Sequence, residues 1–212
     1  MTTPAVQAAR ARLAELGYEV LVFHATGAGG RALEALAEAG LVSGVLDLTT
    51  TELADDLVGG VLSAGPDRLT AAGAAGLPQV IAPGALDMVN FGPPATVPDR
   101  FSGRLFFEHN PTVTLMRTTA QEMGELGGRI GRKVARATGP AEVFWPDRGV
   151  SALDADGQPF RDPHADQACR EALERELSAS GRSLHRMDAH INDPVFAIAM
   201  ADRLHGMIID GS

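Results

Sequence analysis

A glycine-rich bend near the start of the chain has the residue types of a phosphate-binding turn. The stretch "HATGAGGRALEAL" follows an apolar run and leads into a predicted helix. Gly27, Gly29 and Ala32 fit the dinucleotide pattern G-x-G-x-x-[G/A], and Asp47 follows Gly27 by twenty residues. Because peptide N–H groups at a helix start attract anions, we expect a phosphate here and a ribose hydroxyl on Asp47. The alternative is a tight turn without a ligand.

A second group of polar residues follows the next predicted strand. Thr49, Thr50 and Thr51 precede a helical stretch, and Thr49 with Glu52 has the spacing of a capping box. Capping is the ordinary role of such residues, but a hydroxyl-rich helix start could also bind an anion in the same crevice. The predicted cofactor-binding residues are Thr26, Gly27, Gly29, Gly30, Asp47, Thr49, Thr50, Thr51, Gly84 and Asn90.

Histidines near predicted strand ends are the candidates for proton transfer. In "DAHINDPVF", Asp188 and His190 alternate along an extended stretch, so both side chains should point to one side. His109 lies at the end of another predicted strand, and a crevice that gathers these groups could perform acid–base chemistry. We therefore predict His109, His190 and Asp188 as catalytic candidates; the alternative is a structural role. Asp188 and His190 are only two possible metal ligands, which are too few for a metal site, so none is predicted.

The nucleophilic side chains give weaker signals. Cys169 lies within a predicted helix without a basic neighbour to lower its pKa, which favours a small buried apolar residue. Ser151, in "RGVSALD", lacks the G-x-S-x-G elbow. A serine or cysteine hydrolase is therefore the least favoured enzyme class.

Helices and short apolar strands alternate along the chain. This alternation predicts an α/β fold: a Rossmann-like, open, mostly parallel sheet of about six strands with helices on both faces, in a single domain over residues 1–212. The expected strands are residues 18–24, 43–48, 78–84, 103–109, 141–145 and 182–188. Two Gly- and Pro-rich loops, "PGALDMVNFGPPATVPDR" and "PDRGVSALDADGQPFRDP", follow strands and are expected to form the ligand crevice.

Composition excludes some classes of partner. A net charge of -9 argues against a nucleic-acid backbone or an anionic membrane, since both need clustered Lys and Arg. No apolar run has the length of a signal peptide core or a spanning helix, so we expect a cytoplasmic protein. Hydrophobic residues make up 45% and aromatic residues only 5%, which predicts an aliphatic core.

Long phrases of the sequence match one known family. They include "TTPAVQAARARLAELGYEVLVFHATGAGGRALEAL", "GVLDLTTTEL", "PQVIAPGALDMVNFGPP", "HNPTVTLMRTT", "GVSALDADGQPF" and "DAHINDPVF". From Thr2 to about Leu204 the chain resembles the second half of the UPF0261 family, the Tm-1-like ATP-binding proteins. The resemblance implies a two-lobed protein with a Rossmann-like fold in each half, and it implies ATP, with or without Mg²⁺.

The resemblance also implies a partner, because family members carry an amino-terminal lobe that this chain lacks. We expect that lobe as a separate chain, or a second copy of this one, on an exposed apolar surface. The leading hypothesis is a nucleotide-binding or other anion-binding domain; "GAGGRAL" lacks the Lys and Ser/Thr of a Walker A motif. One alternative is an enzyme that uses NAD or acts on a small phosphorylated or carboxylated substrate through His109 or His190. Another is a non-catalytic protein-interaction module.

Overall fold

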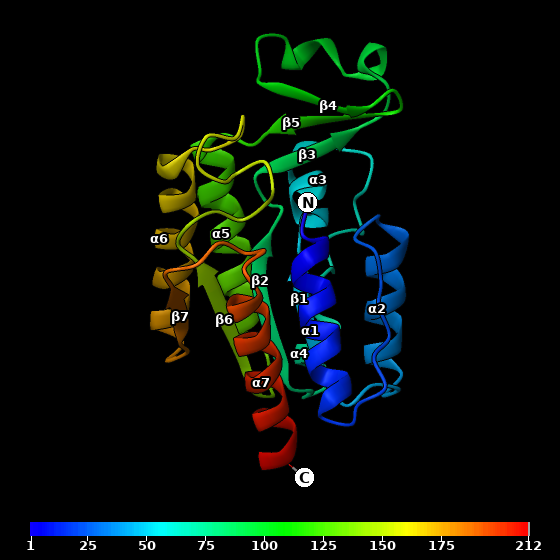
Figure 1. The fold of residues 1–212 in the computed structure, drawn as a ribbon, viewed down its shortest axis with the longest axis vertical. Coiled ribbons are helices and arrows are strands. Elements are labelled where there is room, and N and C mark those ends of the chain that lie inside the picture. Colours follow the sequence, from blue (N-terminus) through cyan, green and yellow to red (C-terminus); the bar gives the residue numbers. More distant parts are fainter. Residues whose placement is uncertain (212) are drawn as a thin grey trace.

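A four-stranded parallel sheet forms the centre of the computed structural model, which describes residues 1–211 (Figure 1). Its strand order is β1-β2-β6-β7, and every neighbouring pair is parallel. The four strands are β1 (Val45–Thr49), β2 (Gln79–Gly84), β6 (Ala141–Pro146) and β7 (Leu184–Met187). All six residues of β2 are buried, as expected for a central strand covered on both faces.

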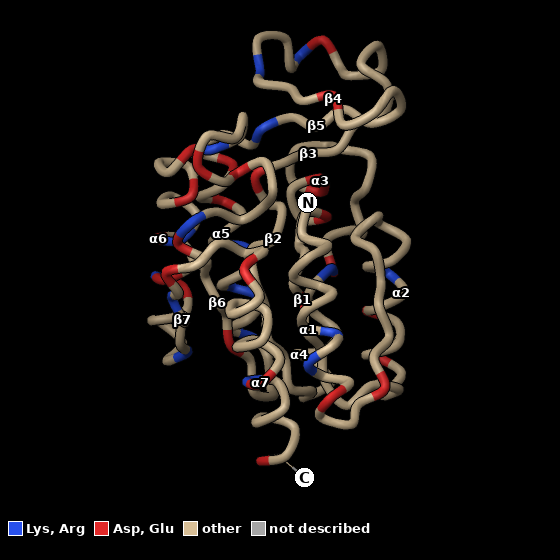
Figure 2. The backbone as a smooth tube through the Cα atoms, viewed as in Figure 1, with Lys and Arg blue, Asp and Glu red and all other residues tan. Residues whose placement is uncertain are grey.

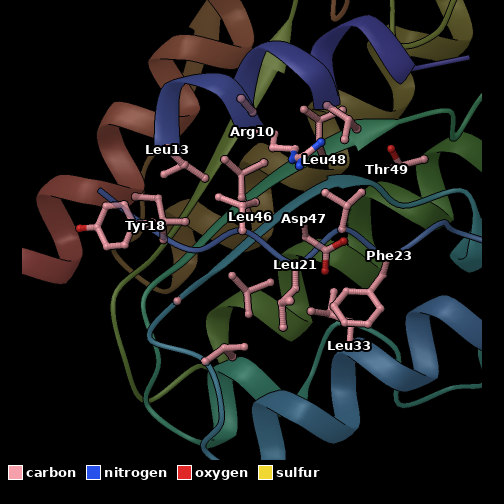
Figure 3. Close-up of a pocket in the computed structure, with 18 of the residues that line it drawn as sticks. Arg10, Leu13, Tyr18, Leu21, Phe23, Leu33, Leu46, Asp47, Leu48 and Thr49 are labelled. Atoms are coloured by element: carbon pink, nitrogen blue, oxygen red, sulfur yellow. The ribbon is translucent and has the colours of Figure 1, made fainter. Parts of the chain in front are cut away.

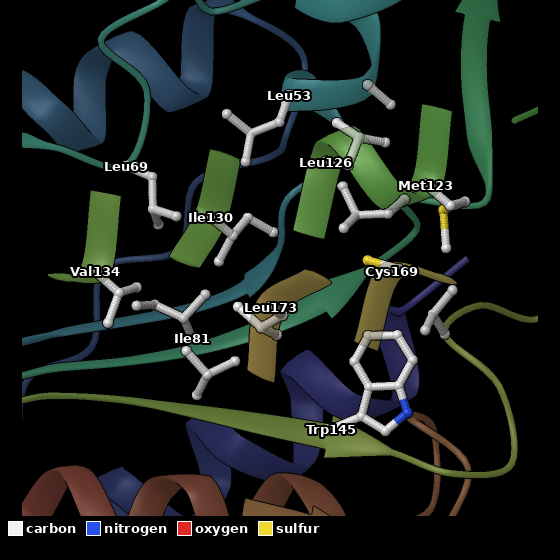
Figure 4. Packing of buried hydrophobic residues seen from close by; sticks show 14 of the residues in the cluster. Leu53, Leu69, Ile81, Met123, Leu126, Ile130, Val134, Trp145, Cys169 and Leu173 are labelled. Atoms are coloured by element: carbon white, nitrogen blue, oxygen red, sulfur yellow. The ribbon is translucent and has the colours of Figure 1, made fainter. Parts of the chain in front are cut away.

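Helices cover both faces of this sheet, as the sequence predicts. On one face, α1 (Thr3–Glu15) and α7 (Pro194–Asp210) pack over Leu48, Val80 and Phe144. The other face is covered by two long helices, α5 (Ala120–Ala135) and α6 (Pro163–Ala179). The short helix α3 (Glu52–Val58) lies beside them. Figure 4 shows Ile81 and Trp145 of the sheet packed against Leu126, Ile130 and Leu173.

A second, smaller sheet lies at one end of the molecule (Figure 1). Its strands are antiparallel, in the order β3-β5-β4. They are β3 (Met88–Phe91), β4 (Phe106–Asn110) and β5 (Val113–Arg117). The remaining elements are α2 (Ala28–Glu38), α4 (Ala71–Ala74) and two short 3₁₀ helices, η1 (Pro94–Thr96) and η2 (Asp99–Phe101).

The expectation of six strands in one parallel sheet is therefore wrong. The strand expected at residues 103–109 forms as β4, but it turns back into β5 as a hairpin. Asn110 explains the turn, because its side-chain oxygen accepts a hydrogen bond from the backbone N–H of Thr112 at 2.9 Å. One of the two expected loops also contains β3. The assignment of one domain to residues 1–212 stays a prediction.

Residues 18–24 are the second departure from the expected sheet. Their apolar run predicts the first strand, yet no strand forms there. Leu21 and Val22 remain 55% and 44% exposed, and a cavity separates this segment from β1. Strand formation requires backbone pairing as well as an apolar pattern, and β1 is left as the edge of the parallel sheet.

Helix ends follow the sequence signals more closely. The long helix expected from residue 120 to 137 is α5, and Thr119 with Glu122 forms both hydrogen bonds of its capping box. No helix described in residues 1–211 is long and apolar enough to span a bilayer.

We predict opposite effects for two alanine substitutions in α5, which packs closely on α6. A Cβ atom at Gly127 would lie 2.1 Å from the carbonyl oxygen of Cys169, whereas one at Gly124 would lie 3.8 Å from its nearest neighbour. Gly127→Ala should lower the free energy of unfolding by roughly 2 kcal/mol. Gly124→Ala should raise it by about 0.5–1 kcal/mol, because alanine favours the helix. Denaturant unfolding measures both, and equal effects would contradict the close approach of the two backbones.

Candidate functional site

The polar residues of interest gather at the carboxyl ends of the parallel strands. In open α/β sheets this edge forms the ligand crevice. The first residues of the chain lie at the same edge: Ala152 N–H and the Asn192 side-chain amide both donate to the carbonyl oxygen of Met1. The hydroxyl groups of Thr2 and Thr49 are 2.7 Å apart.

The glycine bend holds a carboxylate of the protein itself. The N–H groups of Gly27 and Gly30 both donate to Oε1 of Glu52, at 2.6 and 3.0 Å. Glu52 is fully buried. The turn therefore has the anion-binding geometry that the sequence indicates, and its occupant is an internal side chain.

Arg68 completes the environment of that carboxylate. Its Nε donates to Oε2 of Glu52 at 2.6 Å, and its two terminal nitrogens donate to both oxygens of Asp47 at 2.6 and 2.5 Å. Burial alone would lower the pKa of Arg68. The negative charges and hydrogen bonds of Asp47 and Glu52 have the larger effect, so the pKa lies above its ordinary value. Asp47 is thus held by a bidentate ion pair rather than left open for a ribose.

Glu34 links the same arginine to the next element. It accepts from Arg68 at 3.2 Å and also from the backbone N–H groups of residues 69, 70 and 71, where α4 begins. Three carboxylates and one guanidinium therefore form a mutually bonded group, which we call the Arg68 cluster: Glu34, Asp47, Glu52 and Arg68. The sequence reading singled out only Asp47 as a site residue of this cluster.

The predicted threonines are mostly engaged inside the protein. Thr50 donates to the carbonyl of Ala82, and Thr51 donates to that of Met88. The expected capping box of Thr49 and Glu52 does not form, because Glu52 reaches the glycine bend instead. Thr26 is exposed, with one long hydrogen bond of 3.4 Å to the carbonyl of His24.

Three further predicted residues have structural roles: two glycines allow close backbone contacts, and Asn90 forms buried hydrogen bonds. A Cβ atom at Gly84 would lie 2.1 Å from the carbonyl oxygen of Leu48, so β1 and β2 approach too closely for a side chain there. At Gly29 a Cβ atom would lie 1.9 Å from the carbonyl oxygen of His24. Asn90 donates to Asp55 from both its backbone and its side chain. Their role in binding a cofactor stays a prediction.

A second buried cluster surrounds Asp87 and Ser151. Ser151 Oγ donates to one oxygen of Asp87 at 2.7 Å, while the other oxygen has no hydrogen-bond partner among the described residues. Burial, followed by the nearby charge of Asp154, raises the pKa of Asp87 to about 7. Ser151 also accepts from Leu153 N–H at 3.1 Å, so its hydroxyl group is satisfied without a base.

Arginines and further carboxylates close this cluster on its outer side. Asp166 accepts from Arg117 at 3.2 Å and from Arg161 at 2.6 Å. Asp154 Oδ1 lies 3.5 Å from Arg161 and has no hydrogen-bond partner in the described structure. Figure 2 shows acidic and basic residues interspersed in the loops between β5 and α6. The sequence indicated that the loop after β6 forms part of the ligand crevice, but its pattern did not single out Asp154, Arg161 or Asp166.

No hydrogen bond or ion pair joins the three predicted catalytic residues in the described structure. Asp188 forms a bidentate pair with Arg148, at 2.8 Å for both bonds, and both side chains are exposed. His190 lies beside Ser151, whose carbonyl oxygen is 2.9 Å from Nε2. His109 is an exposed residue of β4. The acid–base role of these three residues stays a prediction.

The tautomer of His190 follows from its two neighbours. The N–H of Asn192 donates to Nδ1 at 3.2 Å, so Nδ1 carries no proton. The proton therefore lies on Nε2 and is donated to the carbonyl of Ser151. A neutral imidazole with both nitrogens engaged is well suited to hold the loop after β6, and proton transfer would require one of these bonds to break.

We predict that Asp87 makes stability depend on pH. The folded state holds a proton on Asp87 up to about pH 7, whereas in the unfolded chain the pKa returns to 3.8, so stability falls as pH rises between these values. Asp87→Asn should remove this loss, about 1.4 kcal/mol per pH unit at most. Unfolding at pH 5 and pH 8 measures it, with the exposed Asp99→Asn as the control. A pH profile unchanged by Asp87→Asn would contradict the prediction.

Comparison with known proteins places the chain in a family. The model of the uncharacterised protein family (UPF0261) C-terminal domain matches residues 1–208. A UPF0261 protein of Clostridium tetani is 52% identical over 98% of this chain and 52% of its own length. The ToMV resistance protein Tm-1 of Solanum lycopersicum is 46% identical over 95% of this chain and 27% of its own length. The chain thus spans about half the length of the bacterial relative, and it belongs to the UPF0261 family, as its C-terminal domain.

Proposed function

We propose that this chain is the ligand-binding C-terminal lobe of a two-lobed protein, and that its glycine bend takes a phosphate group of a nucleotide. ATP is the nucleotide that the family resemblance implies. The observation that carries the proposal is the set of donors around Glu52. Two backbone N–H groups and one guanidinium nitrogen converge on a single carboxylate. The same three donors suit a phosphate.

Binding at this turn requires an exchange of anions. Glu52 would leave the N–H groups of Gly27 and Gly30, and a phosphate would accept from them and from Arg68. Arg68 would keep its two bonds to Asp47 throughout. Because the leaving carboxylate is fully buried, the exchange needs a compensating gain, which a nucleotide could supply through contacts of its base and ribose.

A second lobe would supply part of those contacts. Met1 lies at the carboxyl edge of the sheet, so a lobe that contacts the first residues would adjoin the crevice. Exposed apolar side chains are available at the start of β4, where Leu105, just before the strand, is 50% and Phe106 36% exposed. The second lobe would come from a separate chain or from another copy of this one.

Hydrolysis by this lobe alone is not part of the proposal. The glycine bend lacks the Lys and Ser/Thr that hold a triphosphate with Mg²⁺ in P-loop enzymes. The enzyme alternative has less support, because His190 is engaged at both nitrogens and Asp188 at both oxygens. The interaction-module alternative predicts no nucleotide affinity at all.

The proposal predicts that removing the internal anion improves phosphate binding. Glu52→Ala leaves the N–H groups of Gly27 and Gly30 without their acceptor, so inorganic phosphate, AMP and ATP should bind at least about tenfold more tightly than to the unchanged protein. Thermal unfolding in a titration of each compound measures this, since a ligand at a hundredfold excess over its Kd adds ~2.7 kcal/mol. NAD in a parallel titration tests the dinucleotide alternative.

Two further variants make the result decisive. Glu38→Ala, at an exposed position at the end of α2, the helix that follows the glycine bend, should leave all affinities unchanged. Glu52→Gln removes the charge while keeping the side-chain length, and it replaces Glu52→Ala if that variant does not fold. Nucleotides that bind both Glu52 variants no better than the unchanged protein would rule out the turn as their phosphate site. Absence of nucleotide binding throughout would favour the interaction module.

A further inference from the structure

A cavity of about 500 Å³ lies along the free edge of β1. It is bounded by α1, by residues 17–25, by α2 and by β1 (Figure 3). Cavities of this volume commonly hold small organic ligands. The cavity adjoins the Arg68 cluster, because Asp47, Glu52 and Arg68 are among the residues that line it, together with Gly30 of the glycine bend.

The walls of the cavity are mainly aliphatic and aromatic. Figure 3 shows Leu13, Leu21, Phe23, Leu33 and Leu46 around the space, from four different segments of the chain. Such walls favour a ligand with an apolar body, because binding removes apolar surface of both the ligand and the cavity from water.

Backbone groups of β1 add polar contacts along one side. Val45 N–H donates to the carbonyl of Pro78, next to β2, so Val45 and Asp47 direct their backbone groups toward β2. The backbone groups of Leu46, between them, face the other side, where no described strand pairs with β1. The N–H and carbonyl groups of Leu46 are therefore available to a ligand.

The charged side chains that line the cavity include one cation without a partner among the described residues. Asp47 and Glu52 are each bonded to Arg68, so neither offers a free negative charge. Arg10 of α1 and Glu19 both line the cavity, and within residues 1–211 neither side chain has an ion pair or hydrogen bond. In Figure 3 Arg10 lies close to Leu48. One unpaired guanidinium matches one carboxylate or sulfonate.

We propose that this cavity binds a small amphipathic organic anion, with an aliphatic or aromatic body against the leucines and a single acidic group on Arg10. A nucleotide with several negative charges would not suit a site with one free cation. The inference goes beyond the nucleotide proposed for the glycine bend and does not depend on it.

The competing occupant is the protein itself. Residues 18–24 could move onto β1 as a fifth parallel strand, which would fill the cavity and bury Leu21 and Val22. That movement would satisfy the edge of β1 but would leave no room for a ligand. Closure of this strand onto β1 would overturn the proposal.

Anilinonaphthalene sulfonate and octanoate are suitable probes, because each combines one acidic group with an apolar body. The sulfonate dye should bind at one site with increased fluorescence, and octanoate should displace it. Arg10→Gln should weaken both probes by about tenfold. Arg175→Gln is the matched control, because Arg175 is also an exposed helical arginine without a described side-chain partner, and it should change neither affinity.

Leu46→Trp tests the location, because a larger side chain on β1 should fill the space and abolish binding. Its melting temperature shows whether it folds, and Val20→Trp serves in its place if it does not. Three results would overturn the proposal. One is equal affinity in Arg10→Gln and the unchanged protein. Another is binding that survives both filling variants. The third is no binding, with the amide hydrogens of residues 20–22 protected from exchange as in a paired strand.

Discussion

The buried guanidinium of Arg68 holds together the part of the protein that the sequence marks as a binding site. It joins Glu34 of α2, Asp47 of β1 and Glu52 of α3, and through Glu52 it reaches the glycine bend. Removing one member of such a group leaves a buried charge without its partner, which typically costs about 3–5 kcal/mol. The Arg68 cluster therefore fixes the position of the glycine bend relative to the sheet.

The glycine bend shows what a phosphate-binding pattern can and cannot predict. Gly27 and Gly30 do present converging N–H groups, as their spacing indicates. The pattern does not reveal whether the anion comes from a ligand or from the protein, because both satisfy the same donors. Glu52 lies 22 residues beyond Gly30 and has the ordinary appearance of a helix-start residue, so only the fold brings it into the turn.

Periodicity and capping predicted most elements but not their pairing. The capping box at Thr119 and the apolar runs of β1, β2, β6 and β7 depend on neighbouring residues, and all of them form. The antiparallel sheet depends on a hairpin turn at Asn110, and the sequence reading missed that signal. Whether residues 18–24 pair with a strand depends on the position of β1, which lies some distance along the chain. A local sequence pattern does not specify that position.

The buried cluster around Asp87 was harder to anticipate for a similar reason. Asp87, Ser151 and Arg117 come from three segments, and their spacing in the sequence carries no motif. Only the general rule that loops gather at the carboxyl edge pointed to two of these segments. The rule locates a crevice, whereas the charges and unsatisfied oxygens inside it require the folded structure.

The close approach of α5 and α6 has a consequence for how the molecule opens. The backbones meet at Gly127 and Cys169, and Gly131 lies against Glu176, one turn further along. Helices in such contact cannot separate gradually, because water can enter only after the whole seam parts. We expect α5 and α6 to behave as one cooperative unit, the last to exchange its amides and the slowest to be cut by proteases, while the region around residues 18–24 opens first.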